Sequence, residues 1–192
     1  MMYLQQKKNK GKGFTLVEML IAVFIFTISL TSLMNISSKG LKTAKNAEKQ
    51  VVADYLAIEA IEAVRNMRDT SFLRNLGGSD WQTVFQGGNV FGDKGCFDDG
   101  VGASNSCNLL LTSNAPILDA CTNCNVYMNP TNFYYTQSPN DGVAVFPEIF
   151  SGYQRRIKIK KITPGDGQIV VFVTITWDGG EVTYSENLFL WQ

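Results

Sequence analysis

The hydrophobic pattern predicts one long helix near the start of the chain. Between Phe14 and about Asp69 there is no proline and only one glycine, Gly40. Residues 14–34 form a 21-residue apolar run that a single charge, Glu18, interrupts. At about 1.5 Å per residue this run spans about 31 Å, the hydrocarbon thickness of a bilayer. We therefore expect a helix of about 55 residues whose first half is apolar all round, with Gly40 as the place for a bend.

The second half of this helix, residues 35–69, is predicted to be amphipathic. Its polar side holds Asp54, Glu59, Glu62, Arg65 and Asp69, and Glu62 can pair with Arg65 three residues later. A broad apolar stripe on the other side is formed by Val51, Val52, Tyr55, Leu56, Ile58, Ala60, Ile61, Ala63, Val64 and Met67. Such a stripe is expected to pack on a globular partner.

The last part of the chain, residues 131–192, predicts an antiparallel β-sheet. Three segments rich in β-branched residues, 153–162, 168–177 and 181–191, are separated by turn sequences at 163–167 and 178–180, as in a β-meander. An upstream hairpin is expected near Phe133–Thr136 and Val143–Phe146. The face of the middle strand that should pack on the helix contains Ile169, Val171, Val173, Ile175 and Trp177. Helix and meander together predict an α+β fold.

Residues 70–130 have a different character. Glycines are frequent between residues 77 and 102, and they separate short segments such as Trp81–Phe85. We expect this stretch to be a Gly/Cys-rich irregular connection between the helix and the sheet.

The residues around the start of the apolar run form a motif. A basic stub ends in Gly13, and its charges are Lys7, Lys8, Lys10 and Lys12. The sequence G-F-T-L-x-E that follows, with the apolar run behind it, resembles the processing site of type IV prepilins and type II secretion pseudopilins. The resemblance implies that a membrane peptidase removes residues 1–13 by cutting after Gly13, and that the nitrogen of Phe14 is then methylated.

The same resemblance implies a role for Glu18 and a set of partners. One helical turn below the new terminus, the carboxylate of Glu18 would meet the ammonium group of Phe14 on a neighbouring subunit. The implied fold is pilin-like, with residues 14–34 as the transmembrane and assembly helix and residues 35–69 as its amphipathic continuation on the sheet. The implied partners are other pilin or pseudopilin subunits, the prepilin peptidase and methyltransferase, an inner-membrane assembly platform, and membrane lipid before assembly.

Two other interpretations of the N-terminal segment stay open. It could be a secretory signal peptide, although the apolar run is long for one and no convincing A-x-A site follows it. It could also be an uncleaved signal anchor in which Glu18 reaches the membrane interface. In each case the lysines stay cytoplasmic and the C-terminal part is exported, by the positive-inside rule.

The composition of the chain limits the kinds of catalytic and metal site that it can form. The chain has no histidine, which excludes Ser-His, Cys-His and His-metal sites. There is no P-loop or catalytic constellation, so we expect neither an enzyme nor a cofactor. Of the 17 basic residues four lie in the leader, so its removal leaves 13 against 17 acidic residues, a net charge of −4. This acidic excess makes nucleic acid an unlikely general partner.

Four cysteines, Cys96, Cys107, Cys121 and Cys124, lie in the part expected to be exported. An even number outside the cytoplasm favours two structural disulfides, although a metal site or a redox C-x-x-C pair stays open. Of the three possible pairings we favour Cys96–Cys107 with Cys121–Cys124, because each closes a short local loop.

Three further groups of charged residues could form binding sites, but each is also explained by an ordinary structural role. Arg156, Lys158 and Lys160 alternate onto one strand face, which is typical of a solvated outer surface more than of a DNA-binding stripe. Lys42, Lys45 and Lys49 are expected to form a solvated or headgroup-facing strip. A calcium loop could be formed by Asp93, Asp98 and Asp99, but aspartates are also ordinary turn residues.

The predicted function is that of a structural, minor subunit of a type IV pilus-like filament, which begins as a single-pass membrane protein and ends in an extracellular or periplasmic filament. A minor pseudopilin of a type II secretion system is the first alternative. The second is a tip subunit in which residues 77–130 bind a surface ligand or DNA, and a secreted enzyme is a distant fourth reading.

Overall fold

The computed structural model describes residues 13–74, 96–98, 106–111, 116–131, 133–137, 149–162 and 168–189. Predictions for the leader before Gly13, the segment Trp81–Phe85, the hairpin arm Val143–Phe146, the turn 163–167, and Asp93 and Asp99 lie outside these residues. The chain divides into two compact units, Met1–Lys45 and Asn46–Gln192.

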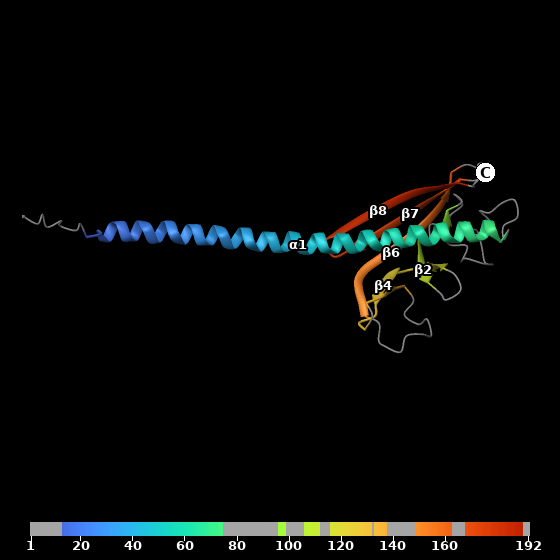
Figure 1. The fold of residues 1–192 in the computed structure, drawn as a ribbon, viewed down its shortest axis with the longest axis horizontal. Helices are drawn as coiled ribbons and strands as arrows, with labels where there is room; N and C mark the ends of the chain where they lie inside the picture. Colours follow the sequence, from blue (N-terminus) through green and yellow to red (C-terminus); the bar gives the residue numbers. More distant parts are fainter. Residues whose placement is uncertain are drawn as a thin grey trace, which may run out of the picture. The chain divides into compact units, whose positions relative to one another are not determined.

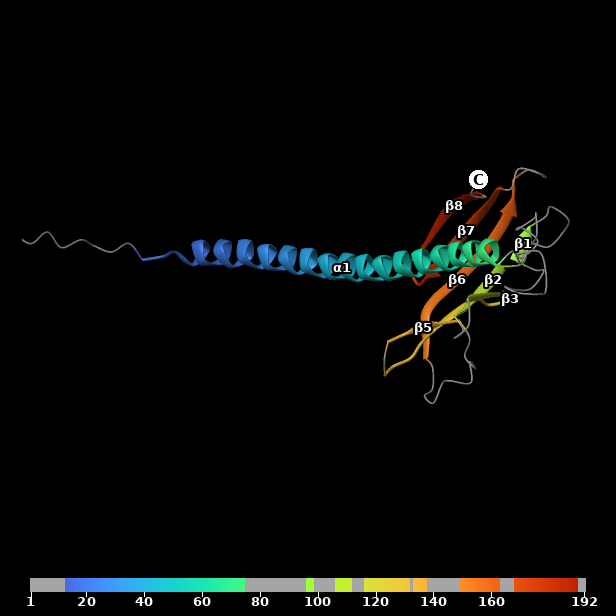
Figure 2. The same cartoon turned by 45° about the vertical axis from the view of Figure 1, so that its right-hand side comes forward.

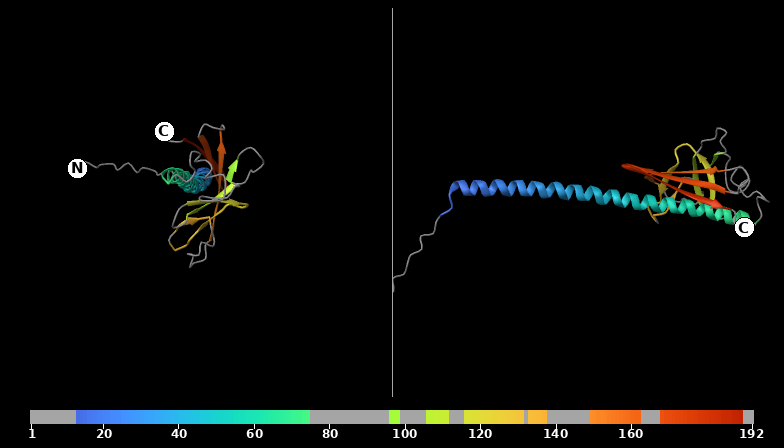
Figure 3. Two further views of the ribbon diagram at one scale, coloured as in Figure 1. Left: turned by 90° about the vertical axis from the view of Figure 1, so that its right-hand side faces the viewer. Right: turned by 90° about the horizontal axis from the view of Figure 1, so that it is seen from above.

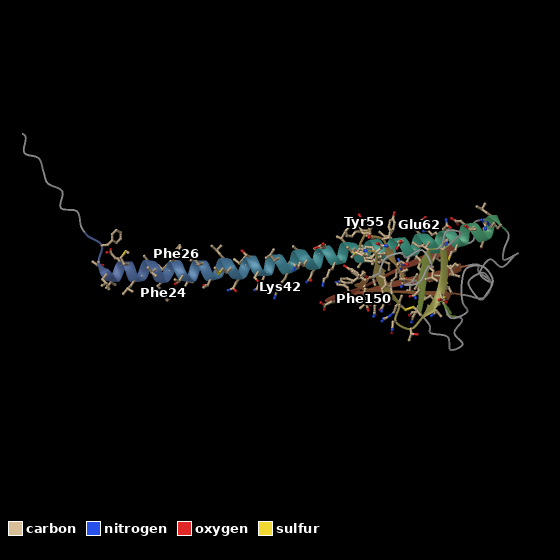
Figure 4. All side chains as sticks on the ribbon, turned by 90° about the horizontal axis from the view of Figure 1, so that it is seen from below. Phe24, Phe26, Lys42, Tyr55, Glu62 and Phe150 are labelled. Atoms are coloured by element: carbon tan, nitrogen blue, oxygen red, sulfur yellow. A yellow bond between two sulfur atoms is a disulfide. The ribbon has the colours of Figure 1, made fainter. Side chains whose placement is uncertain are left out.

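Helix α1, Leu16–Leu73, confirms the prediction of a single long helix. It has 58 residues and ends four residues beyond the expected end at Asp69. In the first unit every described residue is exposed, including the large apolar side chains of the predicted membrane segment. Phe24 and Phe26 project from different sides of the helix (Figure 4), because two residues correspond to about 200° of rotation. By length and composition, α1 contains a stretch suited to cross a membrane.

Within its described residues, the second unit is built on one sheet of eight strands. The strands are β1 (Phe97–Asp98), β2 (Ser106–Leu111), β3 (Pro116–Cys121), β4 (Asn125–Met128), β5 (Tyr135–Thr136), β6 (Ile149–Lys161), β7 (Gln168–Trp177) and β8 (Gly180–Phe189). The long strand β6 lies at the centre. On one side it pairs with β7, which pairs with β8, and on the other it pairs with β1, β2 and β4 (Figures 1 and 2). Among these described strands, all pairs are antiparallel except β1 with β6.

The predicted meander is confirmed by β6, β7 and β8, which follow one another in the sheet as antiparallel neighbours. Asp178 and Gly179 form the turn between β7 and β8, and Gly179 has a φ of 105°, a left-handed value that favours glycine. The next residue, Gly180, is favoured for a different reason, because a Cβ atom there would lie 2.6 Å from the ring of Trp177.

The expectation of an irregular connection over residues 70–130 is wrong for residues 106–128, which include β2, β3 and β4. Asn, Ser and Asp residues interrupt these strands, so their alternation is hard to recognise in the sequence. Each strand nevertheless buries apolar side chains: Cys107 and Leu109 in β2, Leu118 in β3 and Val126 in β4. Pairing with β6 or with one another supplies the ladder that so short a segment needs.

The core of the second unit lies between α1 and the sheet. Figure 3 shows the C-terminal part of α1 running beside the strands. As predicted, Ile169, Val171, Val173 and Ile175 are fully buried, and Trp177 packs against the same cluster. On the helix the buried residues are Ala53, Leu56, Ala57, Ala60, Ala63, Val64, Met67 and Ser71. The many alanines allow the helix backbone to approach the sheet closely.

The predicted stripe on α1 therefore needs a correction. Val51, Tyr55 and Ile58 were assigned to it, but they are 51%, 70% and 59% exposed. The buried face is instead centred on a row of alanines, two of which, Ala53 and Ala57, the stripe omitted. The prediction gave more weight to large apolar side chains than to alanines, and it therefore placed the buried face too far to one side of the helix. The α+β, pilin-like fold class itself is confirmed.

Candidate processing and assembly site

The start of α1 is defined by a capping box. Residues 13–15 are not helical, and the helix begins at Leu16. The backbone N–H and the hydroxyl of Thr15 donate to Oε2 of Glu18 at 2.9 and 3.0 Å. The backbone N–H of Glu18 donates to the hydroxyl oxygen of Thr15 at 3.3 Å. This reciprocal pattern satisfies orphan donors of the first turn.

From the sequence, Glu18 was predicted to pair with a terminal ammonium group or to reach the membrane interface, and the capping box was not predicted. The signal was present, because Thr15-Leu16-Val17-Glu18 has the form Thr-x-x-Glu in front of an apolar run. Both hydrogen bonds that Thr15 donates to the carboxylate use Oε2, and among the described residues none uses Oε1. The carboxylate can therefore cap its own helix and still accept a bond from another molecule.

Gly13 and Phe14 lie directly before this cap. Both residues are exposed, and Phe14 is 83% exposed. A Cβ atom at Gly13 would meet nothing within 4 Å. The peptide bond between them thus lies in a non-helical, open segment, the form in which a protease can bind backbone on both sides.

The structure joins Cys96 to Cys107 and Cys121 to Cys124, the pairing favoured from the sequence. The first disulfide connects the residue before β1 to β2, and the second closes the turn between β3 and β4. Among the described residues no group of His, Cys, Asp and Glu side chains is arranged to hold a metal ion.

The basic strand face lies where the alternation of β6 predicted it. Lys158 and Lys160 are exposed, and Arg156 is half-buried and donates to Oε1 of Gln154 at 3.1 Å. On α1, Lys42 and Lys45 are exposed, whereas Lys49 donates to the carbonyl of Asp178 at 3.1 Å.

A largely buried polar cluster joins the helix to the sheet, and it was not predicted from the sequence. It consists of Arg155 on β6, Glu59 on α1 and Gln137 directly after β5. The side chain of Arg155 is fully buried and pairs with Glu59, which had been assigned to the polar side of the helix. The alternation that places Lys158 and Lys160 outside also places Arg155 inside, so that signal could have identified the arginine.

Comparison with known proteins identifies the N-terminal region. A family model described as the prokaryotic N-terminal methylation motif matches residues 8–34, which include Gly13, Phe14 and Glu18. Neither curated proteins nor solved structures gave a match. The motif implies processing by a prepilin peptidase and assembly with other pilin subunits, and the apolar helix is consistent with a membrane anchor. The chain therefore carries the N-terminal methylation motif characteristic of type IV prepilin-like proteins.

Proposed function

We propose that the chain is a structural subunit of a type IV pilus-like filament, processed after Gly13 and assembled through the N-terminal part of α1. The observation that supports this proposal most strongly is that the residues of the motif coincide with structural features suited to processing and assembly. The methylation motif spans residues 8–34, and within it an open Gly13–Phe14 segment precedes a capped helix with an exposed apolar surface. A helix of this kind needs lipid around it, or other helices like itself.

Processing creates the group that Glu18 is suited to bind. Cleavage after Gly13 leaves an ammonium group on Phe14, and Glu18 lies about one helical turn further along. In water at about 4 Å such a pair contributes only about 1 kcal/mol, but it contributes several times more among packed helices with a low dielectric constant. Because the capping bonds use Oε2, pairing through Oε1 does not require the helix start to unfold.

Before assembly the same helix serves as the membrane anchor. The lysines of the leader keep the N-terminus in the cytoplasm, and the second unit, with its two disulfides, lies on the oxidising side. Assembly then exchanges lipid for the apolar helices of neighbouring subunits.

The role within the filament is a finer part of the proposal. The length of the chain and the C-terminal meander favour a minor subunit, and a minor pseudopilin of a type II secretion system is the alternative. Pili and secretion filaments share this N-terminal motif, so abundance in sheared surface material distinguishes them. A few copies in sheared filaments support a minor pilin, whereas retention in the cell envelope supports a pseudopilin.

A second candidate function, ligand binding at a filament tip, is favoured by a groove in the second unit, although only Leu111 of its lining residues lies in the expected binding region 77–130. The groove has a volume of about 730 Å³ and is lined by Val52, Tyr55, Leu56, Glu59, Leu111, Phe133, Tyr134, Tyr135 and Thr136. Phe133 has a left-handed φ of 60° and is 67% exposed. Its loop therefore exposes an aromatic ring to solvent although this backbone conformation is unfavourable in free energy. If this function is correct, Phe133→Ser leaves filaments intact but reduces adherence of the cells.

The proposed processing is tested by substituting the glycine before the scissile bond. Gly13→Val adds a branched side chain where the peptidase must approach the backbone, and Gly11→Val is the matched control two residues away. We expect the Gly13 variant to stay at full length in the membrane and the control to be cleaved and to enter filaments. Equal cleavage of both variants would contradict the proposed site.

A further inference from the structure

The turn closed by the Cys121–Cys124 disulfide lies at one end of a hydrogen-bonded path to α1. The carbonyl oxygen of Cys124 accepts two bonds, from the backbone N–H of Arg155 at 2.9 Å and from Nε2 of Gln137 at 3.1 Å. Cys124 itself has a left-handed φ of 50°. The direction of this carbonyl therefore depends on an unusual backbone conformation at a residue that is not glycine.

Gln137 transmits the position of that carbonyl to Arg155. Its side-chain nitrogen, in a residue that is 2% exposed, lies within hydrogen-bond distance of three acceptors: the carbonyl oxygens of Arg155 and Cys124 at 2.8 and 3.1 Å, and Oδ1 of Asn108 at 2.9 Å. Its oxygen accepts from Nε of Arg155 and from the backbone N–H of Leu109, both at 2.8 Å. A rotation of this amide would leave several buried groups without partners, so the Cys124 carbonyl helps to hold the amide in one orientation.

Arg155 then reaches the helix. Its Nη1 donates to the carbonyl oxygen of Leu56 at 3.3 Å and to Oε2 of Glu59 at 2.5 Å. Burial lowers the pKa of Arg155, and the nearby Glu59 carboxylate opposes that shift. A buried charge is tolerated only when it is paired and oriented, so the docking of α1 on the sheet depends on where this guanidinium points.

The turn that contains the left-handed Cys124 is also the turn that the disulfide closes. A left-handed φ at a residue with a Cβ atom costs on the order of 1–2 kcal/mol, and the Cys121–Cys124 bond restricts the turn to conformations that bring the two sulfurs together. Without that bond the turn can relax to ordinary φ values. We expect that the Cys124 carbonyl then loses its bond to Gln137, which would weaken the support of Arg155.

We propose that the Cys121–Cys124 pair is an oxidation site that controls the docking of α1 on the sheet. The two thiols lose two electrons and two protons when they form the disulfide. A thiol–disulfide exchange partner accepts them, and its own disulfide becomes two thiols. The exchange stabilises the docked state of the second unit, which couples the stability of that state to arrival in an oxidising compartment.

The test compares two double variants of the full chain in detergent micelles. Cys121→Ser with Cys124→Ser removes the proposed control site, and Cys96→Ser with Cys107→Ser removes the other disulfide as a matched control. Loop entropy alone predicts a larger effect for the control, because its cysteines are 11 residues apart instead of 3. Our proposal predicts instead that loss of Cys121–Cys124 affects α1 more than loss of Cys96–Cys107 does. Hydrogen exchange of residues 53–67 should accelerate on the order of tenfold in the first variant, as expected for one unsatisfied buried group, and by less in the control.

A third variant tests the path. Arg155→Met replaces the buried charge with a shorter, unbranched apolar side chain, so in this background loss of the Cys121–Cys124 bond should no longer change the exchange of α1. Additive effects would overturn the proposal. So would equal acceleration of α1 and of the β7–β8 hairpin, because that result indicates general destabilisation. A larger effect of the control on α1 would also overturn it.

Discussion

The ion pair between Glu59 and Arg155 gives the sharpest stability prediction for the second unit. Glu59→Ala leaves the fully buried guanidinium of Arg155 without its counter-charge. Removing one partner of a buried pair costs about 3–5 kcal/mol. Because the side chain of Glu59 is 36% exposed, solvent screens part of the interaction, and we expect about 2–3 kcal/mol.

The chain offers a matched control on the next helical turn. Glu62→Ala removes a pair with Arg65 at 3.0 Å in which the Glu62 side chain is 67% exposed. Arg65 keeps two bonds of 2.7 Å to Glu186, so the loss should stay below about 0.5 kcal/mol. Both variants exchange a helical glutamate for alanine, so differences in helix propensity cancel between them.

The assay is thermal unfolding of the processed chain in detergent, followed by circular dichroism of the β-sheet. For a unit of about 150 residues, 1 kcal/mol corresponds to roughly 2–4 °C in Tm. We therefore expect Glu59→Ala to lower Tm by about 5–10 °C and Glu62→Ala by about 2 °C or less. Adding Arg155→Met to Glu59→Ala should restore much of the loss, because no unpaired charge remains buried. Equal shifts for the two glutamates, or no recovery with methionine, would refute this reasoning.

Three further predictions concern the N-terminal site and one turn. Thr15→Val removes the capping hydroxyl and should lower the incorporation of the subunit into filaments, whereas Thr15→Ser, which keeps it, should not; equal incorporation would show that the cap is dispensable. Glu18→Ala should insert in the membrane as the parent does but enter filaments poorly, and normal surface incorporation would argue against pairing with the Phe14 ammonium. Gly180→Ala should cost about 1–3 kcal/mol in thermal unfolding because its Cβ meets the Trp177 ring at 2.6 Å, whereas Gly40→Ala, with nothing within 4 Å, should cost nothing.

The parts of the fold that the sequence predicted are those with a long, regular pattern. An uninterrupted stretch without proline predicted α1, and the alternation in residues 168–177 predicted both β7 and its buried face. The turn was predicted at residues 178–180 from its Asp-Gly-Gly sequence, and the structure places it at Asp178 and Gly179, with Gly180 already in β8. In each case the same physical requirement repeats over several residues, so the pattern identifies the element.

The parts that could not be predicted depend on contacts between distant segments. Gln137 is one polar residue outside any regular element, and only the fold brings it to Arg155, 18 positions away. Glu59 was assigned to solvent because a single helix cannot show that an arginine approaches from the sheet. The strands β2, β3 and β4 were missed because a stretch of 4–6 residues is stabilised by its neighbours more than by its own pattern.

The most direct test of the central proposal is the mass of the N-terminal peptide in sheared surface material from the native cell. Our account predicts a chain that begins at N-methylated Phe14, found by intact and peptide mass spectrometry in the filament fraction. The same terminus found only in the membrane would favour the pseudopilin alternative. A chain that begins at Met1, or one cut beyond Met34, would contradict prepilin processing and with it the proposed function.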